Sequence, residues 1–446
     1  MSKKTPIVAI VGRANVGKSS LFNVLVGAKQ AIVAREAGTT RDSITEIIDV
    51  NGKPAWLVDT AGLKNAEDEF EASIQDQIAQ AADSADHILV MIEADRIIDD
   101  EDRRVAKTAL KTKKPVTLVV NKIDRNQKAE LSDFQKLGVK DIYTTSTTTR
   151  QGISELLNHL DVSLPLTEYN TDHSTIKIAL LGRPNVGKSA LFNALAKKQQ
   201  AVVSDRAGTT RDVNKQTIRY HGKELQLMDT AGIRRSGKIE VGIERFSVIR
   251  SLRAIEDADI CLLLTDVNEP ATVLDQKIAG LIKDAGKGLV IIVSKWDTAE
   301  KDAFTRDKLA AKFRHQFDFV PWAPMIFTSS VSGQNVTKLF DLALQLHEAR
   351  TKKIKTSRLN KWLASVIISH PPAGLKNTHP RINYVTQTDD ATPTFKFFGS
   401  YMKYLHWGYK RHLERRLREE FGFEGTAIKM TFTEKHDERK SKGKKK

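Results

Sequence analysis

The chain contains two copies of one domain-sized segment, and this duplication limits its fold more than any other feature. Three motifs recur at a constant offset of 170 residues: 12–19 returns as 182–189, 38–42 as 208–212, and 59–62 as 229–232. A fourth motif, 121–124, corresponds to 294–297 at an offset of 173. These offsets are far above the roughly 20–50 residues of solenoid repeats. The chain is therefore a tandem duplication of a whole domain, followed by a segment of a different kind.

Each copy reads as short apolar strands that alternate with helical stretches. The order predicts an α/β fold in which each copy has a doubly wound, mostly parallel sheet. Polar residues after Pro165 predict a linker. The expected strands are 7–11, 55–58, 88–92 and 116–120 in the first copy, and 176–181, 225–228, 260–264 and 289–293 in the second.

The single cysteine, Cys261, lies within one of these expected strands. We interpret it as a small buried hydrophobe rather than a redox group. One cysteine cannot form an intramolecular disulfide or a cysteine-based zinc site, and this usage fits a reducing cytoplasm.

Both copies carry a G-x-x-x-x-G-K-S loop between an expected strand and an expected helix. Such a loop wraps a triphosphate with main-chain N–H groups, and the positive end of the next helix faces the same anion. Lys18 and Lys188 are predicted to reach the β- and γ-phosphates, and Ser19 and Ser189 to offer hydroxyls to Mg²⁺. The predicted loop residues are Gly12, Arg13, Ala14, Asn15, Val16, Gly17, Lys18 and Ser19, and Gly182, Arg183, Pro184, Asn185, Val186, Gly187, Lys188 and Ser189.

The second and third repeated motifs predict the parts that sense the γ-phosphate. Asp59 and Asp229 end apolar strands, where a carboxylate that supports Mg²⁺ belongs. The backbones of Gly62 and Gly232 are predicted to bind the γ-phosphate, and Thr40 and Thr210 to close over the metal. A threonine in an ordinary loop turn is the alternative for either one alone. The remaining residues predicted here are Thr60, Ala61 and Leu63, and Thr230, Ala231 and Ile233.

The fourth motif predicts which base is bound. A carboxylate at Asp124 or Asp297 can accept from both N1–H and the N2 amino group of guanine, a donor pair that adenine lacks. The stems of Lys122 and Lys295 are expected to cover the base. The other predicted residues are Asn121 and Ser294, which tie the base loop to the phosphate loop, and Ser146, Thr147, Ser329 and Ser330, which place a backbone N–H on guanine O6. We expect a weaker tie from the shorter Ser294.

The positive charge of the chain is concentrated at its C-terminal end. Residues 351–446 carry 22 basic and 9 acidic side chains, whereas residues 1–170 carry 22 basic and 25 acidic ones. A basic segment on a nearly neutral body suggests a polyanionic partner, nucleic acid first. A solubilising tail is the alternative that charge alone leaves open.

The C-terminal segment predicts a small α+β domain in the order helix, two strands, helix, strand. The expected elements are 359–368, 381–387, 394–398, 409–421 and 427–432. Arg411, Arg415 and Arg418 are expected on one face of the second helix, either contacting RNA or forming a solvated face braced by pairs with glutamates, among them Arg416–Glu420. The G-x-x-G at 422–425 has the spacing of an RNA-clamping loop, but its position suggests a helix cap.

These residues resemble the bacterial double-GTPase family Der, also called EngA. The resemblance covers nearly the whole chain. It rests on the two G-R-x-N-V-G-K-S loops, the two G-T-T-R-D segments, the two D-T-A-G motifs and the C-terminal stretches 359–363, 370–372, 413–418 and 421–426. It implies a GTPase that acts in assembly of the large ribosomal subunit and contacts rRNA through a C-terminal KH-like domain. Departures from the family pattern are Ala14, Ala61, Thr147, Ser294 and Ser330, and they bear on relative affinity rather than on activity class.

We therefore expect two GTPase domains at 1–164 and 175–350, a linker at 165–174, a KH-like domain at 351–434, and a basic disordered tail at 435–446. The expected cofactors are GTP or GDP, Mg²⁺ and K⁺. The chain has no apolar run of the roughly 18 residues that a membrane span needs. We expect a cytoplasmic monomer.

Leu63 and Ile233 occupy the place where many GTPases carry the glutamine that orients the attacking water. Similarity to related GTPases implies that Asn15 and Asn185 bind K⁺, which supplies positive charge instead. The alternative is that these asparagines only support the loop turn.

The missing glutamine also leaves open a scaffold in which GTP is structural. A tRNA-modification GTPase is a third and weaker hypothesis, because no accompanying catalytic domain is present.

Overall fold

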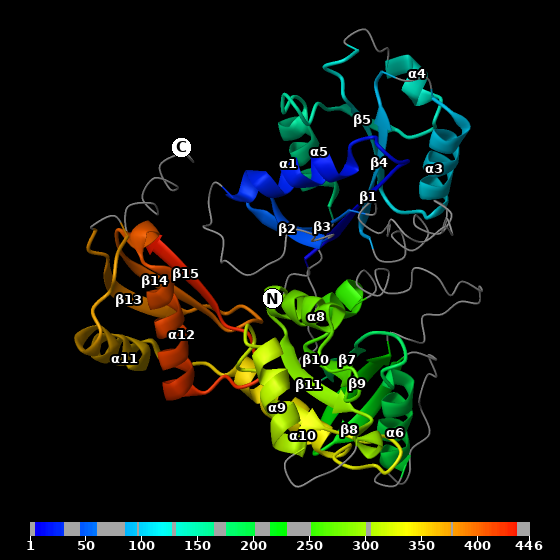
Figure 1. The fold of residues 1–446 in the computed structure, drawn as a ribbon. Coiled ribbons are helices and arrows are strands. Elements are labelled where there is room, and N and C mark those ends of the chain that lie inside the picture. The colour runs from blue at the N-terminus through cyan, green and yellow to red at the C-terminus, as the bar shows by residue number, and fades with distance from the viewer. Residues whose placement is uncertain are drawn as a thin grey trace. The chain divides into compact units, whose positions relative to one another are not determined.

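The computed structural model describes residues 5–30, 45–59, 85–95, 98–126, 131–164, 175–200, 215–229, 251–299, 305–375 and 378–434. Within these residues the chain forms three sheets, one in each repeat and one in the C-terminal segment. The first repeat lies in one compact unit, and most of the second repeat lies with the C-terminal segment in another. The arrangement of elements inside each part can be followed in Figure 1.

The first repeat has a six-stranded sheet in the order β2-β3-β1-β4-β5-β6. Only β2 runs antiparallel to its neighbour. Every residue of β1 and β4 is buried, so both faces of the sheet need covering helices. The strands are β1 (Ile7–Val11), β2 (Thr45–Val50), β3 (Lys53–Asp59), β4 (His87–Glu93), β5 (Val116–Asn121) and β6 (Asp141–Thr144), and the helices are α1 (Lys18–Gln30), α3 (Asp100–Lys111), α4 (Leu131–Gln135) and α5 (Ile153–Ser163).

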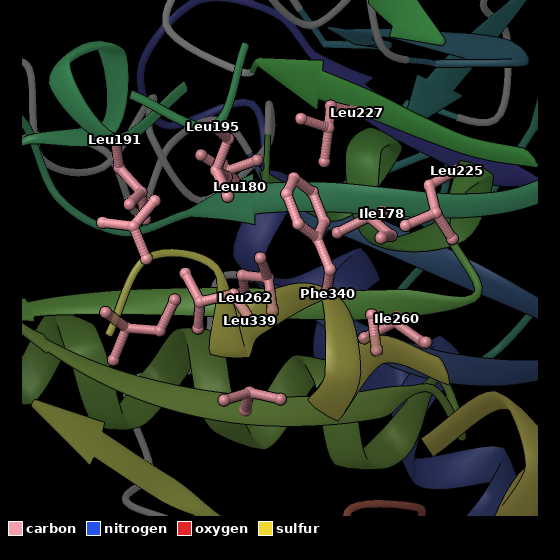
Figure 2. Close-up of a cluster of buried hydrophobic side chains, with 14 of the residues drawn as sticks. Ile178, Leu180, Leu191, Leu195, Leu225, Leu227, Ile260, Leu262, Leu339 and Phe340 are labelled. Carbon is pink, nitrogen blue, oxygen red and sulfur yellow. The ribbon is translucent and has the colours of Figure 1, made fainter. Parts of the chain in front are cut away.

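The second repeat has the same strand order, β8-β9-β7-β10-β11-β12, with β8 antiparallel to β9. Figure 2 shows its core, where Ile178 and Leu262 from the sheet meet Leu195 from α6 and Phe340 from α10. The strands are β7 (Thr175–Leu181), β8 (Lys215–Tyr220), β9 (Lys223–Asp229), β10 (Ile260–Asp266), β11 (Gly288–Ser294) and β12 (Met325–Phe327). The helices are α6 (Lys188–Gln200), α8 (Val273–Asp284), η2 (Trp296–Thr298), α9 (Thr305–Gln316) and α10 (Lys338–Thr351). The predicted α/β class is confirmed in both repeats.

Cys261 is fully buried in β10, and burial raises the pKa of its thiol to about 12. A thiol that stays protonated at neutral pH is a weak nucleophile, which agrees with the structural role expected from its position.

The C-terminal segment is an α+β domain with a three-stranded mixed sheet. β13 pairs antiparallel with β14, and β14 pairs parallel with β15. Leu413, Leu417 and Phe421 of the second helix are buried, as their spacing predicts. The elements are α11 (Thr356–Ser369), β13 (Arg381–Gln387), β14 (Thr394–Ser400), η3 (Met402–Tyr404), α12 (Trp407–Phe421) and β15 (Lys429–Glu434).

Backbone and side-chain contacts join the second repeat to the C-terminal domain. The carbonyl of Gly286 accepts a hydrogen bond from the Thr392 hydroxyl of the C-terminal domain at 2.8 Å, and also one from Arg350 of its own repeat at 2.7 Å. Gly425 donates to the Trp322 carbonyl at 2.8 Å, and a Cβ at Gly425 would collide with the side chain of Leu346, whose Cδ1 would lie 2.5 Å away. Because these hydrogen bonds are directional, they fix how the C-terminal domain attaches to the second repeat.

The G-x-x-G turn is therefore part of this junction. Gly422 has φ +86 and closes α12 by donating to the Arg418 carbonyl at 2.8 Å, which agrees with the helix-cap interpretation. Phe423 is buried.

Arg418 points inward rather than toward a ligand. Its guanidinium pairs with Glu414 at 2.7 Å, donates to the carbonyls of Phe423 and Thr426, and lies 5.3 Å from the centre of the Trp322 ring. Arg418 thus lies in neither expected arrangement: it pairs with a glutamate, as the second one supposed, but its side chain is largely buried and not part of a solvated face. The predicted Arg416–Glu420 pair is wrong: Arg416 pairs with Glu419 at 2.9 Å, and Glu420 pairs with Arg358 of α11 at 3.5 Å.

Candidate guanine-nucleotide sites

Each phosphate loop leaves the end of a buried central strand and enters a helix. In the first repeat the loop joins β1 to α1, and in the second it joins β7 to α6. Lys18 donates to the Gly12 carbonyl at 2.7 Å and also to that of Arg13. Lys188 donates to the carbonyls of Gly182 at 2.8 Å and Arg183 at 2.7 Å. The two loops thus hold their lysine in the same way, with the amine inside the ring of main-chain groups.

Ser19 and Asp59 meet beside the first loop. The Ser19 hydroxyl donates to Asp59 Oδ2 at 2.6 Å, although the two residues lie on different elements. A hydroxyl and a carboxylate are hard oxygen ligands of the kind that Mg²⁺ prefers, so this pair fits a magnesium ion. In the second repeat Ser189 takes the same place at the start of α6, and Asp229 ends β9. Ten predicted residues lie outside the described residues: Thr40, Thr60, Ala61, Gly62, Leu63, Thr210, Thr230, Ala231, Gly232 and Ile233.

The base loops are tied to the phosphate loops in both repeats. Asn121 donates from Nδ2 to the Val16 carbonyl at 3.0 Å. Ser294 reaches the equivalent carbonyl, that of Val186, at 2.7 Å. Ser294 therefore keeps the tie despite its shorter side chain, and the lower strength expected of that tie stays a prediction. Asn121 also accepts a hydrogen bond from Thr145 at 3.3 Å.

The lysines of the two base loops adopt the same left-handed backbone, with φ +64 at Lys122 and +56 at Lys295. Lys122 pairs with Glu93 and donates to the Asn15 carbonyl at 3.0 Å. Lys295 pairs with Asp266 at 2.7 Å. Burial alone would raise the pKa of Asp266, but hydrogen bonds from Lys295 and the Asn268 backbone outweigh it and hold that pKa below its usual value.

Two further features of the base sites bear on the predicted contacts with guanine. Asp124 is half-buried and Asp297 is exposed, each two residues after its lysine, so a base can reach both carboxylates. The N–H of Ser146 donates to the Gln151 carbonyl at 3.0 Å, and that of Ser329 to Gln334 at 3.3 Å. In each loop the N–H of the following residue, Thr147 or Ser330, is therefore the better candidate for a contact with the base.

The side chains of Arg13 and Arg183 turn toward carboxylates of their own domain. Arg13 forms ion pairs with Asp99 (2.9 Å) and Asp102 (3.1 Å), which together cap α3. Arg183 pairs with Glu269 and lies 3.8 Å from Asp275, which caps α8. Burial raises the pKa of Asp102 to about 6 despite the arginine. The nucleotide-binding motifs did not predict these ion pairs between the loop arginines and the helix caps. The capping-box spacing of the acidic residues at the start of α3 was nevertheless present in the sequence.

Both repeats and the C-terminal domain match known protein families. Residues 7–122 and 177–295 match the family described as 50S ribosome-binding GTPase, and residues 353–433 match the KH-domain-like C-terminal domain of EngA bacterial GTPase enzymes. GTPase Der of Herpetosiphon aurantiacus is 41% identical over 443 residues, which cover 97% of each chain. The chain belongs to the GTPase Der family. GTPase Der of Chloroflexus aggregans is also 41% identical, over 96% of this chain and 97% of the relative.

Solved structures match smaller parts of this Der-family chain. The G domain of the T. maritima FeoB iron transporter is 28% identical and covers 36% of this chain and 98% of its own, with a TM-score of 0.28. Era of Aquifex aeolicus is 21% identical over 58% of this chain and 93% of its own, with a TM-score of 0.30.

The chain is thus a GTPase with two tandem GTP-binding domains and a KH-like domain. A helix long and apolar enough to cross a membrane does not occur among its described residues.

Proposed function

We propose that this chain is a nucleotide-switched assembly factor for the large ribosomal subunit, and that its basic C-terminal domain contacts rRNA. The observation that carries the proposal is the junction at Gly286 and Gly425, which joins a GTP-binding domain to the basic domain. A change in nucleotide state can thereby alter how the basic domain is presented. Because bacterial ribosomes assemble in the cytoplasm, we place the chain there, acting as a monomer.

The described residues have separate roles in binding GTP. Lys18 and Lys188 neutralise the β- and γ-phosphates, while the loop N–H groups surround them. Asp124 and Asp297 select guanine by accepting from its N1–H and N2 amino group. Ser294 keeps the second base loop in register, so both sites remain specific for guanine.

Magnesium would be held by Ser19, Asp59 and Thr40 in the first site, and by Ser189, Asp229 and Thr210 in the second. When bound, the ion neutralises charge on the phosphate oxygens. We assign Gly62 and Gly232 to the γ-phosphate through their backbone N–H groups, so loss of that phosphate frees the segment that follows.

Leu63 and Ile233 have no polar side chain and cannot orient the attacking water, so hydrolysis has to depend on another group, such as a cation that stabilises the charge of the transition state. We assign K⁺ binding to Asn15 and Asn185. Both have left-handed backbones, with φ +66 and +63, a conformation that asparagine tolerates well. The left-handed backbone is by itself a sufficient reason for asparagine in a loop turn. The dependence of hydrolysis on K⁺ therefore distinguishes K⁺ binding from a purely structural role of Asn15 and Asn185.

A GTP-dependent scaffold is the second candidate, and Leu63 and Ile233 favour it. Co-sedimentation with purified large ribosomal subunits separates the two. The assembly switch predicts different amounts of pelleted protein with a non-hydrolysable GTP analogue and with GDP. Equal pelleting in both states, with normal growth of cells that carry only a hydrolysis-dead chain, would support the scaffold instead.

A further inference from the structure

Residues 401–411 of the KH-like domain expose two large aromatic side chains. Trp407 is 58% exposed and Tyr401 is 57% exposed, whereas Trp362 of the same domain is 7% exposed. Trp407 begins α12, and Tyr401 immediately precedes η3. An indole left in water at the start of a helix contributes little to the core, so its presence calls for another explanation.

Cations lie over the rings of this segment. The Arg411 guanidinium is 4.8 Å from the centre of the Trp407 ring, and the Lys403 amine is 5.0 Å from that of Tyr404. The sequence has no acidic residue from 391 to 413, and Glu414 is paired with Arg418. Counting only residues that the structure describes, Lys403 and Arg411 form no ion pair. Their charge is therefore available to an anionic partner.

The backbone at Tyr401 adds a second observation. Its φ is +57, in the left-handed region that favours glycine or asparagine. A tyrosine there is strained, and its exposed ring recovers little of that cost through packing. Strain held at an exposed aromatic residue is typical of a binding site.

We propose that Tyr401, Lys403, Trp407 and Arg411, which we call the 401–411 platform, bind unpaired RNA nucleotides. Bases stack on the exposed rings while the two cations contact the phosphates. In an RNA duplex the base faces are already stacked, so the platform selects single-stranded segments. The uncompensated cations favour RNA over a protein partner. This inference rests on the proposed rRNA contact and names the surface and the RNA form.

The test uses the full-length chain in saturating GDP at fixed KCl. Binding of fluorescent twelve-nucleotide uridine and adenosine strands is compared with binding of a twelve-base-pair RNA duplex. Trp407→Ala should weaken single-strand binding about tenfold and leave duplex binding within about twofold, since stacking on one aromatic has this effect. Trp407→Phe should restore most of the affinity. Arg411→Ala should reduce the slope of log affinity against log salt concentration by about 1, the value expected for the loss of one phosphate contact.

Lys361→Ala is the control matched to Arg411→Ala. Lys361 is exposed on α11, outside the 401–411 platform, and its substitution removes one positive charge, as Arg411→Ala does. It should weaken both RNA forms slightly and equally. Two results for Trp407→Ala would contradict binding of unpaired nucleotides by the platform: unchanged affinity for the single strands, or an equal loss of affinity for single strands and duplex. So does a Trp407→Ala chain that loses ribosome pelleting but binds oligonucleotides normally, since that result identifies a protein partner. Failure of the wild-type chain to pellet with large subunits would instead count against the proposed function.

Discussion

Two glycines at equivalent positions of the phosphate loops have different surroundings. Gly17 and Gly187 both have φ +98. A Cβ at Gly17 would overlap the amide nitrogen of Asn121, whereas a Cβ at Gly187 meets nothing within 4 Å. The difference follows from the base loops, because Ser294 is shorter than Asn121. The chain therefore contains its own control for the contact between the two loops.

Alanine at either position carries the same backbone strain, about 1–2 kcal/mol. Only Gly17→Ala also displaces Asn121, breaks its 3.0 Å bond to Val16 and leaves buried polar groups unpaired. That loss is worth about 1–3 kcal/mol. Since the loop must hold this shape to bind nucleotide, the first site should lose about 5- to 150-fold more affinity than the second.

Titration with a fluorescent GDP measures each site while the other is silenced, by Asp297→Asn for the first and Asp124→Asn for the second. Adding Asn121→Ser to Gly17→Ala recreates the geometry of the second site and should recover much of the lost affinity. Equal losses in the two alanine variants, with no recovery in the double variant, would refute the reasoning.

Three further predictions concern the ions, the base and pH. Hydrolysis should be faster in KCl than in NaCl, and Asn15→Ala should remove the difference; equal rates in both salts for the wild-type chain count against K⁺. Asp297→Asn should exchange guanosine for xanthosine nucleotides at the second site, because its amide donates where the carboxylate accepted; an unchanged preference in competition binding refutes this. Burial, with repulsion from His159, lowers the pKa of His87 from 6.5 to about 4. Between pH 6.5 and 4, His87 is protonated in the unfolded chain but stays neutral in the folded one. Calorimetry should therefore show the free energy of unfolding falling by up to about 3 kcal/mol as the pH is lowered from 6.5 to 4. His87→Gln should flatten that slope, and an unaltered slope contradicts the assignment.

The central strands and both phosphate loops could be predicted from the sequence. Strands buried on both faces, such as β4 and β10, are continuous apolar runs with little ambiguity. The edge strands β2 and β8 were not predicted, because they mix charged and apolar residues and are defined by pairing with the next strand.

Features that depend on contacts distant in sequence could not be predicted. Arg13 sits in a nucleotide-binding motif, yet its side chain is held by Asp99, 86 residues away. Arg418 shares a helical pattern with Arg411, but the Trp322 ring lies beneath only Arg418. Ser294 makes its tie to the phosphate loop because the two loops approach closely, a distance that residue size alone does not reveal.

The most direct test of the central claim uses the Asp297→Asn chain with purified large ribosomal subunits. The first site is kept saturated with GDP, and only the second site is changed, from a xanthosine diphosphate to a non-hydrolysable xanthosine triphosphate. If the second site switches the attached KH-like domain, the affinity measured by co-sedimentation should change by about 5- to 150-fold, the usual range of coupling between sites. Equal affinity in the two states, with both nucleotides shown to be bound, would contradict the account.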